Sequence, residues 1–182
     1  MKTNLLRIPL LLLLGITISF FLLPSCEKLK EATTFKVKVD LPDSHYNLDT
    51  VSYLKSEQVL FSQSSSINID SIVGSRNGLV ERVSFYKLRF SIVSPETAKL
   101  NWLDSARVRV TSDGGTPIEI ATSPTINATD NSIDFVVKDV DVIEIVKKPF
   151  IITLLGNLNG NLPSLPMEVL LESGIEITIC PL

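Results

Sequence analysis

The side chains that could support catalysis are few and lie far apart in the sequence. The only histidine, His45, follows Pro42 and Asp43. A Ser-His-Asp hydrolase would depend on this one imidazole, because histidine alone has an unperturbed pKa near neutrality. Ser52 and Lys55 form a Ser-x-x-Lys sequence, but the companion motifs of serine acyl-enzymes are missing. We therefore predict that the protein is not an enzyme.

Acidic and aromatic residues offer binding chemistry instead. The acidic group comprises Asp130, Asp134, Asp139, Asp141 and Glu144. Calcium takes about six to eight oxygen ligands, and the spacing of these residues is not that of a calcium loop. We therefore expect no metal ion and no cofactor. Trp102 could form a sugar platform with Tyr46, Tyr53 and Tyr86, but the pattern favours an indole that plugs one end of the fold.

Cys26 is the most informative residue because the composition changes abruptly around it. Lys2 and Arg7 give a basic start, an apolar run covers 10–23, and charged residues follow the cysteine at once. This order is typical of a secretory signal peptide. Two alternatives are an uncleaved membrane helix and simple secretion with a free thiol. The apolar run is short of the roughly 20 residues that span a bilayer, which disfavours the first.

The residues Leu23, Pro24, Ser25 and Cys26 resemble the lipobox of bacterial lipoproteins, and in particular small cell-envelope lipoproteins of the Bacteroidota. The resemblance implies that 1–25 is a type II signal peptide and that the Cys26 thiol carries diacylglycerol, usually with a third acyl chain on the new amino group. Several acyl chains hold a protein to a membrane far more firmly than one. The resemblance also implies an outer-membrane location, facing either the periplasm or the cell surface.

The rest of the chain divides into a lipidated, charged tether over 26–33 and one domain over 34–182. Without Lys2 and Arg7, 15 of the 17 basic residues remain against 20 acidic ones, a formal charge of −5. This acidic balance excludes a nucleic-acid partner. Cys180 is the only cysteine besides Cys26, so a disulfide framework is also excluded.

Apolar residues alternate with polar ones in several segments, which predicts half-buried strands. One such segment is 35–41, and others follow at 86–92, 106–110 and 133–137. Frequent turns and little helix predict a β-sandwich of about seven to nine strands, with immunoglobulin-like strand order suggested. The expected core residues are Tyr86, Leu88, Phe90, Ile92, Ala106, Val108, Val110, Ile133, Phe135 and Phe150.

The last segment predicts one long strand. Apolar residues from Met167 to Ile179 share odd parity on both sides of Gly174, so a strand bent or bulged at Gly174 fits better than a hairpin. One or two helical turns are expected, the first capped by Asp70. The second is expected to be capped by Asp141 and Glu144 and to end before Pro149.

Three Asp-Ser/Thr sequences resemble the O-glycosylation motif of Bacteroidota extracytoplasmic proteins, and they imply candidate sites at Thr50, Ser71 and Ser105. The functional prediction is a non-catalytic binding or structural module of the cell envelope, held to the membrane through Cys26, whose partner is an unidentified protein or glycan. Alternatives are a subunit of a surface assembly and a carbohydrate-capture lipoprotein. A hydrolase is the least favoured reading.

Overall fold

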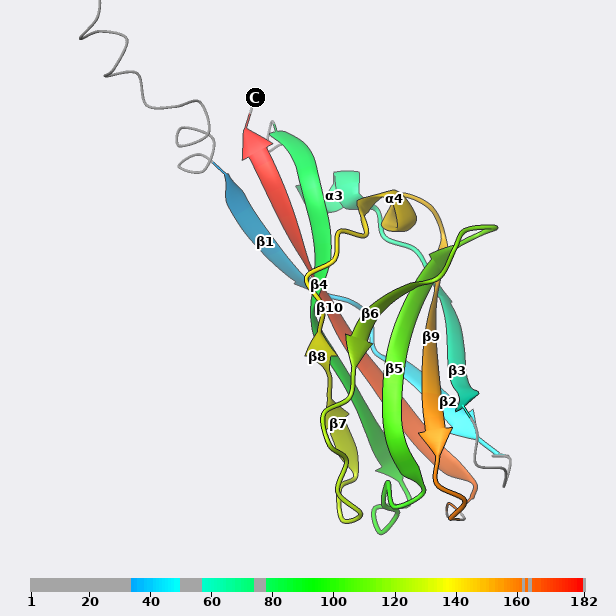
Figure 1. Ribbon diagram of the computed structural model, residues 1–182. Helices are drawn as coiled ribbons and strands as arrows, with labels where there is room; N and C mark the ends of the chain where they lie inside the picture. Colours follow the sequence, from blue (N-terminus) through cyan, green and yellow to red (C-terminus); the bar gives the residue numbers. More distant parts are fainter. Residues whose placement is uncertain (1–33, 50–56, 74–77, 162, 164, 182) are drawn as a thin grey trace, which may run out of the picture.

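Two antiparallel sheets face each other in the computed structural model, which describes residues 34–49, 57–73, 78–161, 163 and 165–181 (Figure 1). The first, sheet A, contains β1 (Phe35–Asp40), β2 (Ser44–Leu48), β4 (Gly78–Ser94), β7 (Ser132–Asp134) and β10 (Met167–Pro181). The second, sheet B, contains β3 (Glu57–Ser65), β5 (Leu103–Ser112), β6 (Ile118–Thr122), β8 (Val136–Val137) and β9 (Phe150–Leu158). The predicted β-sandwich is therefore confirmed.

The long strand β10 lies inside sheet A and organises it. On one side β10 pairs with β1 and β2 in succession, and on the other it pairs with β4 along nearly its whole length. In the immunoglobulin arrangement the last strand lies at an edge, so the strand order differs from the one suggested by the sequence. Sheet B has the order β3-β9-β5-β6-β8, so β9 is an inner strand. Its segment 150–155 has apolar residues on both faces, which is typical of such a strand.

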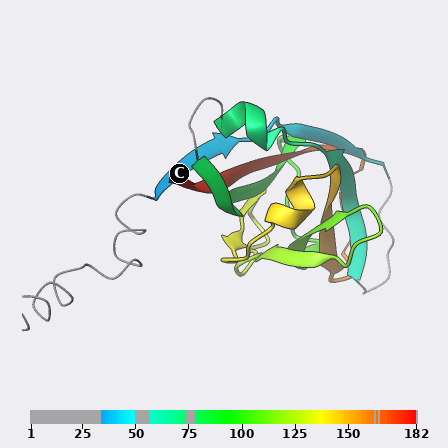
Figure 2. The ribbon, with the colours of Figure 1, turned by 90° about the horizontal axis from the view of Figure 1, so that it is seen from above.

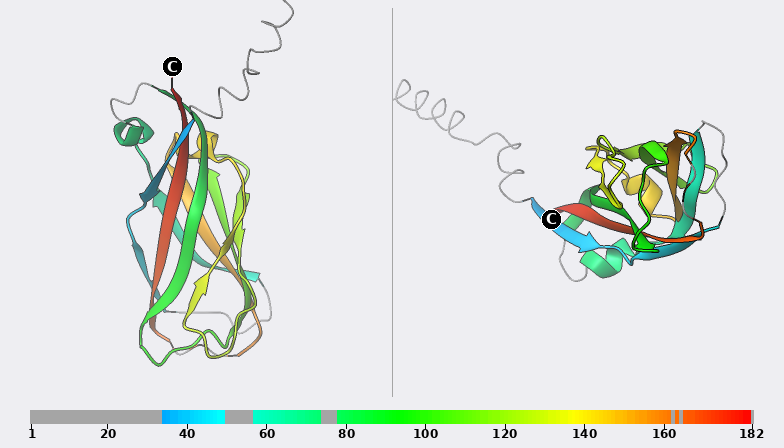
Figure 3. Two further views of the ribbon diagram at one scale, coloured as in Figure 1. Left: turned by 90° about the vertical axis from the view of Figure 1, so that its left-hand side faces the viewer. Right: turned by 90° about the horizontal axis from the view of Figure 1, so that it is seen from below.

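The space between the sheets is closed at its sides and at its upper end. On one side the chain changes sheets at Phe135, between β7 in sheet A and β8 in sheet B. On the other, the rings of Tyr46 and Phe61 meet edge to face with centroids 5.4 Å apart. The short helix α4 (Ile143–Val146) covers the upper end, where Figure 2 shows it between the sheets. The two views in Figure 3 show the long strands β10 and β4 with the shorter β1 beside them, and the resulting closed cross-section.

Nine of the ten expected core residues are buried, each at most 8% exposed: Leu88, Phe90, Ile92, Ala106, Val108, Val110, Ile133, Phe135 and Phe150. The predicted single strand through Gly174 is also present, and its odd-numbered residues face the core from Met167 to Ile179. Alternation is a sound guide here because successive strand residues point to opposite faces.

Tyr86 is the exception, and the prediction that it belongs to the core is wrong. Opposite Gly174 and Ile175 the strand β4 contains one extra residue, Tyr86, which makes a β-bulge. The bulge changes which residues of β4 face the core. Before the bulge an odd-numbered residue, Phe85, faces the core, and after it an even-numbered residue, Leu88, does so. The Tyr86 ring instead covers Gly174 on the outer face, and its hydroxyl donates to Asp40 at 2.5 Å.

Two expected helix caps are also corrected. In α3 (Ile69–Val73) Asp70 lies inside the helix, and Asn68 Oδ1 accepts the backbone N–H of Ser71 at 3.0 Å. In α4 the N-cap is Val142, which makes no side-chain cap. Asp141 lies one residue earlier, where its Oδ1 accepts the backbone N–H groups of Ile143 and Val83. Glu144 bonds to Lys147 at 2.7 Å instead of completing a capping box.

Candidate functional site

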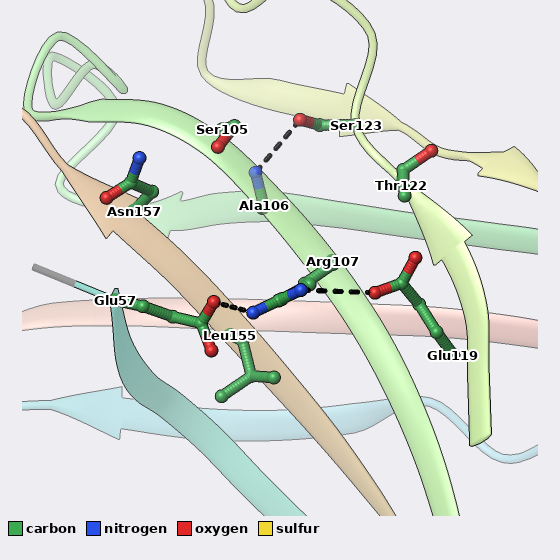
Figure 4. A pocket seen from close by; sticks show the side chains of 9 residues that line it. All are labelled: Glu57, Ser105, Ala106, Arg107, Glu119, Thr122, Ser123, Leu155 and Asn157. Carbon is green, nitrogen blue, oxygen red and sulfur yellow. Dashed lines mark hydrogen bonds and ion pairs between the residues drawn. The ribbon is translucent and has the colours of Figure 1, made fainter. Parts of the chain in front are cut away.

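A polar hollow of about 370 Å³ lies on the outer face of sheet B, across strands β3, β9, β5 and β6 (Figure 4). Its volume is within the range of about 300–1,000 Å³ that small-molecule sites occupy. We call this concavity the sheet B hollow. Its lining residues are Glu57, Ser105, Ala106, Arg107, Glu119, Thr122, Ser123, Leu155 and Asn157.

Three β-bulges near the hollow shape the sheet around it. The extra residues are Leu60 on β3, Asp104 on β5 and Ile120 on β6. A bulge bends its strand and re-aims the side chains that follow it. On β6 the bulge brings both Glu119 and Thr122 to the hollow, although strict alternation would place residues three apart on opposite faces.

A chain of alternating charges crosses the hollow, with Arg107 at its centre. One guanidinium nitrogen of Arg107 bonds to Glu57 Oε2, and another lies 3.4 Å from Glu119 Oε2. The second oxygen of Glu119 accepts from Lys138 Nζ at 2.5 Å. Beneath these side chains lies Leu155, which is 8% exposed yet belongs to the outer face rather than to the core cluster.

The ion pairs lower the pKa of the Glu119 carboxyl. The hydrogen bond from Lys138 holds the pKa of Glu119 below its ordinary value of 4.5, and the charge of Arg107 acts in the same direction, while partial burial opposes both. Glu119 is therefore a stable carboxylate at neutral pH. It accepts hydrogen bonds and has no proton to deliver.

The candidate modification sites are placed as follows. Cys26 and Thr50 lie outside the described residues. Ser71 is exposed on α3, and its hydroxyl donates to the Asn68 carbonyl at 2.9 Å. Ser105 is exposed on β5 and lines the sheet B hollow. A glycan on Ser105 and a separate ligand in the hollow would therefore compete for the same space.

The candidate catalytic and metal-binding side chains that the structure describes do not converge. His45 is exposed on β2, with Nδ1 at 2.9 Å from Glu168 Oε1, whereas Ser52 and Lys55 are outside the described residues. Within the described ranges, no group of three or more His, Cys, Asp or Glu residues could hold a metal ion. The acidic residues are separately engaged: Asp134 with Arg89, Asp139 with Arg82, Asp130 with Asn127, and Asp141 and Glu144 as described above.

The less favoured alternative, a sugar platform, is not assembled by the aromatic residues that the structure describes. Trp102 is fully buried, as the plug interpretation predicted, and Tyr46 and Tyr86 lie on different strands in separate contacts, with Phe61 and with Asp40 respectively. Tyr53 is outside the described residues.

Sequence reasoning missed the hollow, although a signal was present. Adjacent buried residues interrupt the alternation at Leu60–Phe61 and at Ile120–Ala121, and each pair marks a bulge. A break of this kind in an alternating segment is a recognisable sign of a bulge. The convergence of Glu57, Arg107 and Glu119 could not be read in this way, because it depends on which strands pair.

Comparison with known proteins adds little to this description. No protein-family model and no curated protein matches the chain. A solved structure from Desmodium yellow mottle tymovirus is 10% identical, covers 80% of this chain and 90% of its own, and superimposes with a TM-score of 0.19, a likeness too weak to support any argument. In the part of the chain that the structure describes, no helix is long and apolar enough to cross a membrane.

Proposed function

We propose that the protein is a lipid-anchored module of the cell envelope, tethered through Cys26, that binds a ligand or partner without transforming it. The sheet B hollow is the observation that carries the binding part of this proposal. A solvated sheet face needs no concavity, yet here three bulges and nine lining residues build one. The tether follows from the signal-like start and the lipobox-like residues before Cys26.

The chemistry of the hollow favours binding over hydrolysis. A glycosidase needs one carboxylic acid whose pKa is raised so that it can protonate the leaving group. The pKa of Glu119 is shifted in the opposite direction, and both Glu57 and Glu119 are paired with Arg107. The lining can therefore donate and accept hydrogen bonds without a proton poised for transfer.

The alternative role, as a subunit of a surface assembly, would need a free strand edge that accepts a strand from a partner. The long last strand does not supply one. Between Met167 and Ile179, β10 is bonded on one side to β4 and on the other to β1, β2 and the N–H of Leu41. An assembly would have to use a different strand, which makes this the second choice.

Metabolic labelling with an alkyne-tagged palmitate tests the tether. We expect labelling of the wild-type protein and of the matched control Cys180→Ala. In Cys26→Ala we expect loss of the label and retention of the 25-residue leader. Labelling that persisted in Cys26→Ala, or that was lost in Cys180→Ala, would contradict the proposal. Proteinase treatment of whole cells then separates a cell-surface location from a periplasmic one.

A further inference from the structure

We propose that the sheet B hollow binds a neutral saccharide, one or two pyranose rings in size. This inference rests on the proposed binding function and adds the class of ligand. Its first support is the kind of hydrogen-bonding groups that line the hollow. Planar groups come from Arg107, Glu57, Glu119 and Asn157, and hydroxyl groups come from Ser105, Thr122 and Ser123.

A sugar hydroxyl suits this lining because it donates one hydrogen bond and accepts others. It can enter between Arg107 and either glutamate, accepting from the guanidinium and donating to the carboxylate. Neither partner is then left without a hydrogen bond, which avoids the penalty for an unpaired polar group. Arg107 is 36% exposed and Glu57 40%, so the ligand can reach both members of this pair from solvent.

The charges of the hollow select against ionic ligands. Arg107 is neutralised by two carboxylates, so a carboxylate or phosphate on the ligand would have to displace Glu57 or Glu119 and would face the other. A compact cation would meet carboxylates that Arg107 and Lys138 already occupy. A neutral molecule meets neither obstacle.

The hollow also has an apolar surface on which the C–H face of a sugar ring can rest. Leu155 forms its floor, and Val59, which pairs with Leu155 between β3 and β9, is 61% exposed beside it. Leu155 is only 8% exposed, so most of the apolar area that a sugar ring could cover comes from Val59 at the edge of the hollow.

The test uses the full-length protein in a zwitterionic detergent that carries no sugar head group. Saturation-transfer NMR and isothermal titration would measure binding of neutral disaccharides (maltose, cellobiose and lactose), of digalacturonic acid and of the glucosamine dimer. We expect at least one neutral disaccharide to bind. We expect the anionic and cationic probes to bind about tenfold more weakly or not at all.

Arg107→Met keeps the aliphatic stem and removes the central donor, so it should weaken binding of the neutral sugar by about tenfold or more. Arg109→Met is the matched control, because Arg109 lies two residues further along the same face of β5 and does not line the hollow. Thr122→Val is nearly isosteric and should also weaken binding. It provides a second test of the hollow if Arg107→Met does not fold. Thermal unfolding shows whether each variant is folded.

Three results would overturn the inference: no neutral sugar bound by the folded protein, equal loss in Arg107→Met and Arg109→Met, or tighter binding of a charged probe. Each of these results can be told apart from a failure of the proposed lipid anchor, because the palmitate experiment does not involve sugars. If a charged probe bound the wild-type protein and not Arg107→Met, the hollow would remain a binding site and only the assignment to a saccharide would be wrong.

Discussion

Gly156→Ala tests the packing that shapes the sheet B hollow. A Cβ added to Gly156 would lie 2.5 Å from Leu60 Cδ1 and 2.7 Å from Leu103 Cδ1. Carbon atoms pack comfortably at about 3.5–4.0 Å, so the two leucines would have to move by about 1 Å. Both are core residues, 4% and 2% exposed. Leu60 is also the extra residue of the β3 bulge, so Gly156 makes room for the bulge to point inward.

The expected cost follows from two opposing terms. Overpacking a core lowers stability by about 1–3 kcal/mol, and replacing glycine restricts the unfolded chain, which restores about 0.4–1 kcal/mol. We therefore expect Gly156→Ala to lower the free energy of unfolding by about 1.3 kcal/mol, the middle of a range from about 0 to about 2.6 kcal/mol. Leu60→Ala alone should cost about 2–5 kcal/mol. In the Leu60→Ala background only the contact with Leu103 Cδ1 remains, and Leu103 can move into the vacated space. The same glycine change should therefore cost about 1 kcal/mol less there than in the wild-type protein.

Denaturant unfolding followed by tryptophan fluorescence measures all four proteins of this double-mutant cycle. Trp102 is the only tryptophan and is fully buried, so its emission reports directly on the core. Gly174→Ala is the control, because there the new Cβ meets the ring of Tyr86, which can swing outward into solvent. Its effect should be smaller and independent of Leu60. Costs for Gly156→Ala that agreed within about 0.5 kcal/mol in both backgrounds would refute the reasoning.

The other predictions concern the core and two titrating groups. Phe90→Ala should lower stability by about 3–5 kcal/mol in denaturant unfolding, because Phe90 is 1% exposed, and a change below about 1 kcal/mol would mean that its side chain does not pack in the core. Glu119→Gln should lose up to about 1 kcal/mol at pH 7. Since the folded pKa of Glu119 is depressed, this difference should be present above pH 4.5 and disappear as acid protonates the wild-type carboxyl below it; a pH-independent difference in unfolding curves would contradict the ion-pair account. Tyr86 should ionise above pH 10.0 in an ultraviolet absorbance titration, because its hydrogen bond to Asp40 raises its pKa, and Asp40→Asn should lower that pKa again. The stabilisation from this bond is present below pH 10 and is lost as the pH rises through the folded pKa.

Much of the fold could be predicted from the sequence because alternation reports which face of a strand is buried. Val108 and Val110 on β5, and the odd-numbered residues of β10, illustrate this. Alternation fails where a strand contains an extra residue. Even parity with Leu88 predicts a core position for Tyr86, but the bulge at Tyr86 itself reverses the parity. The adjacent apolar residues Phe85 and Tyr86 mark the break in the alternation, but the partner strand determines which of the two is the extra residue.

The candidate site was less predictable than the fold. Glu57 and Arg107 are separated by 50 residues and meet only because β9 places β3 and β5 on its two sides. The sequence contained the polar residues but no rule for pairing these strands. The lipobox-like residues before Cys26 are the opposite case, since their pattern is local and needs no fold to be recognised.

The position of β1 has a mechanical consequence for a protein held by its N-terminal end. β1 runs antiparallel to β10, from Phe35 opposite Ile179 to Asp40 opposite Gly174. The sheet B hollow lies in the other half of the sandwich, away from the start of β1 (Figures 1 and 4). A pull between the tether and a ligand in the hollow would therefore act along β1. Hydrogen bonds between antiparallel strands run perpendicular to the strands, so this load shears all the bonds of the pair together instead of opening them one by one. With the anchor proposed at Cys26 and a ligand in the hollow, the β1–β10 pair would thus be loaded in the direction in which it resists force best.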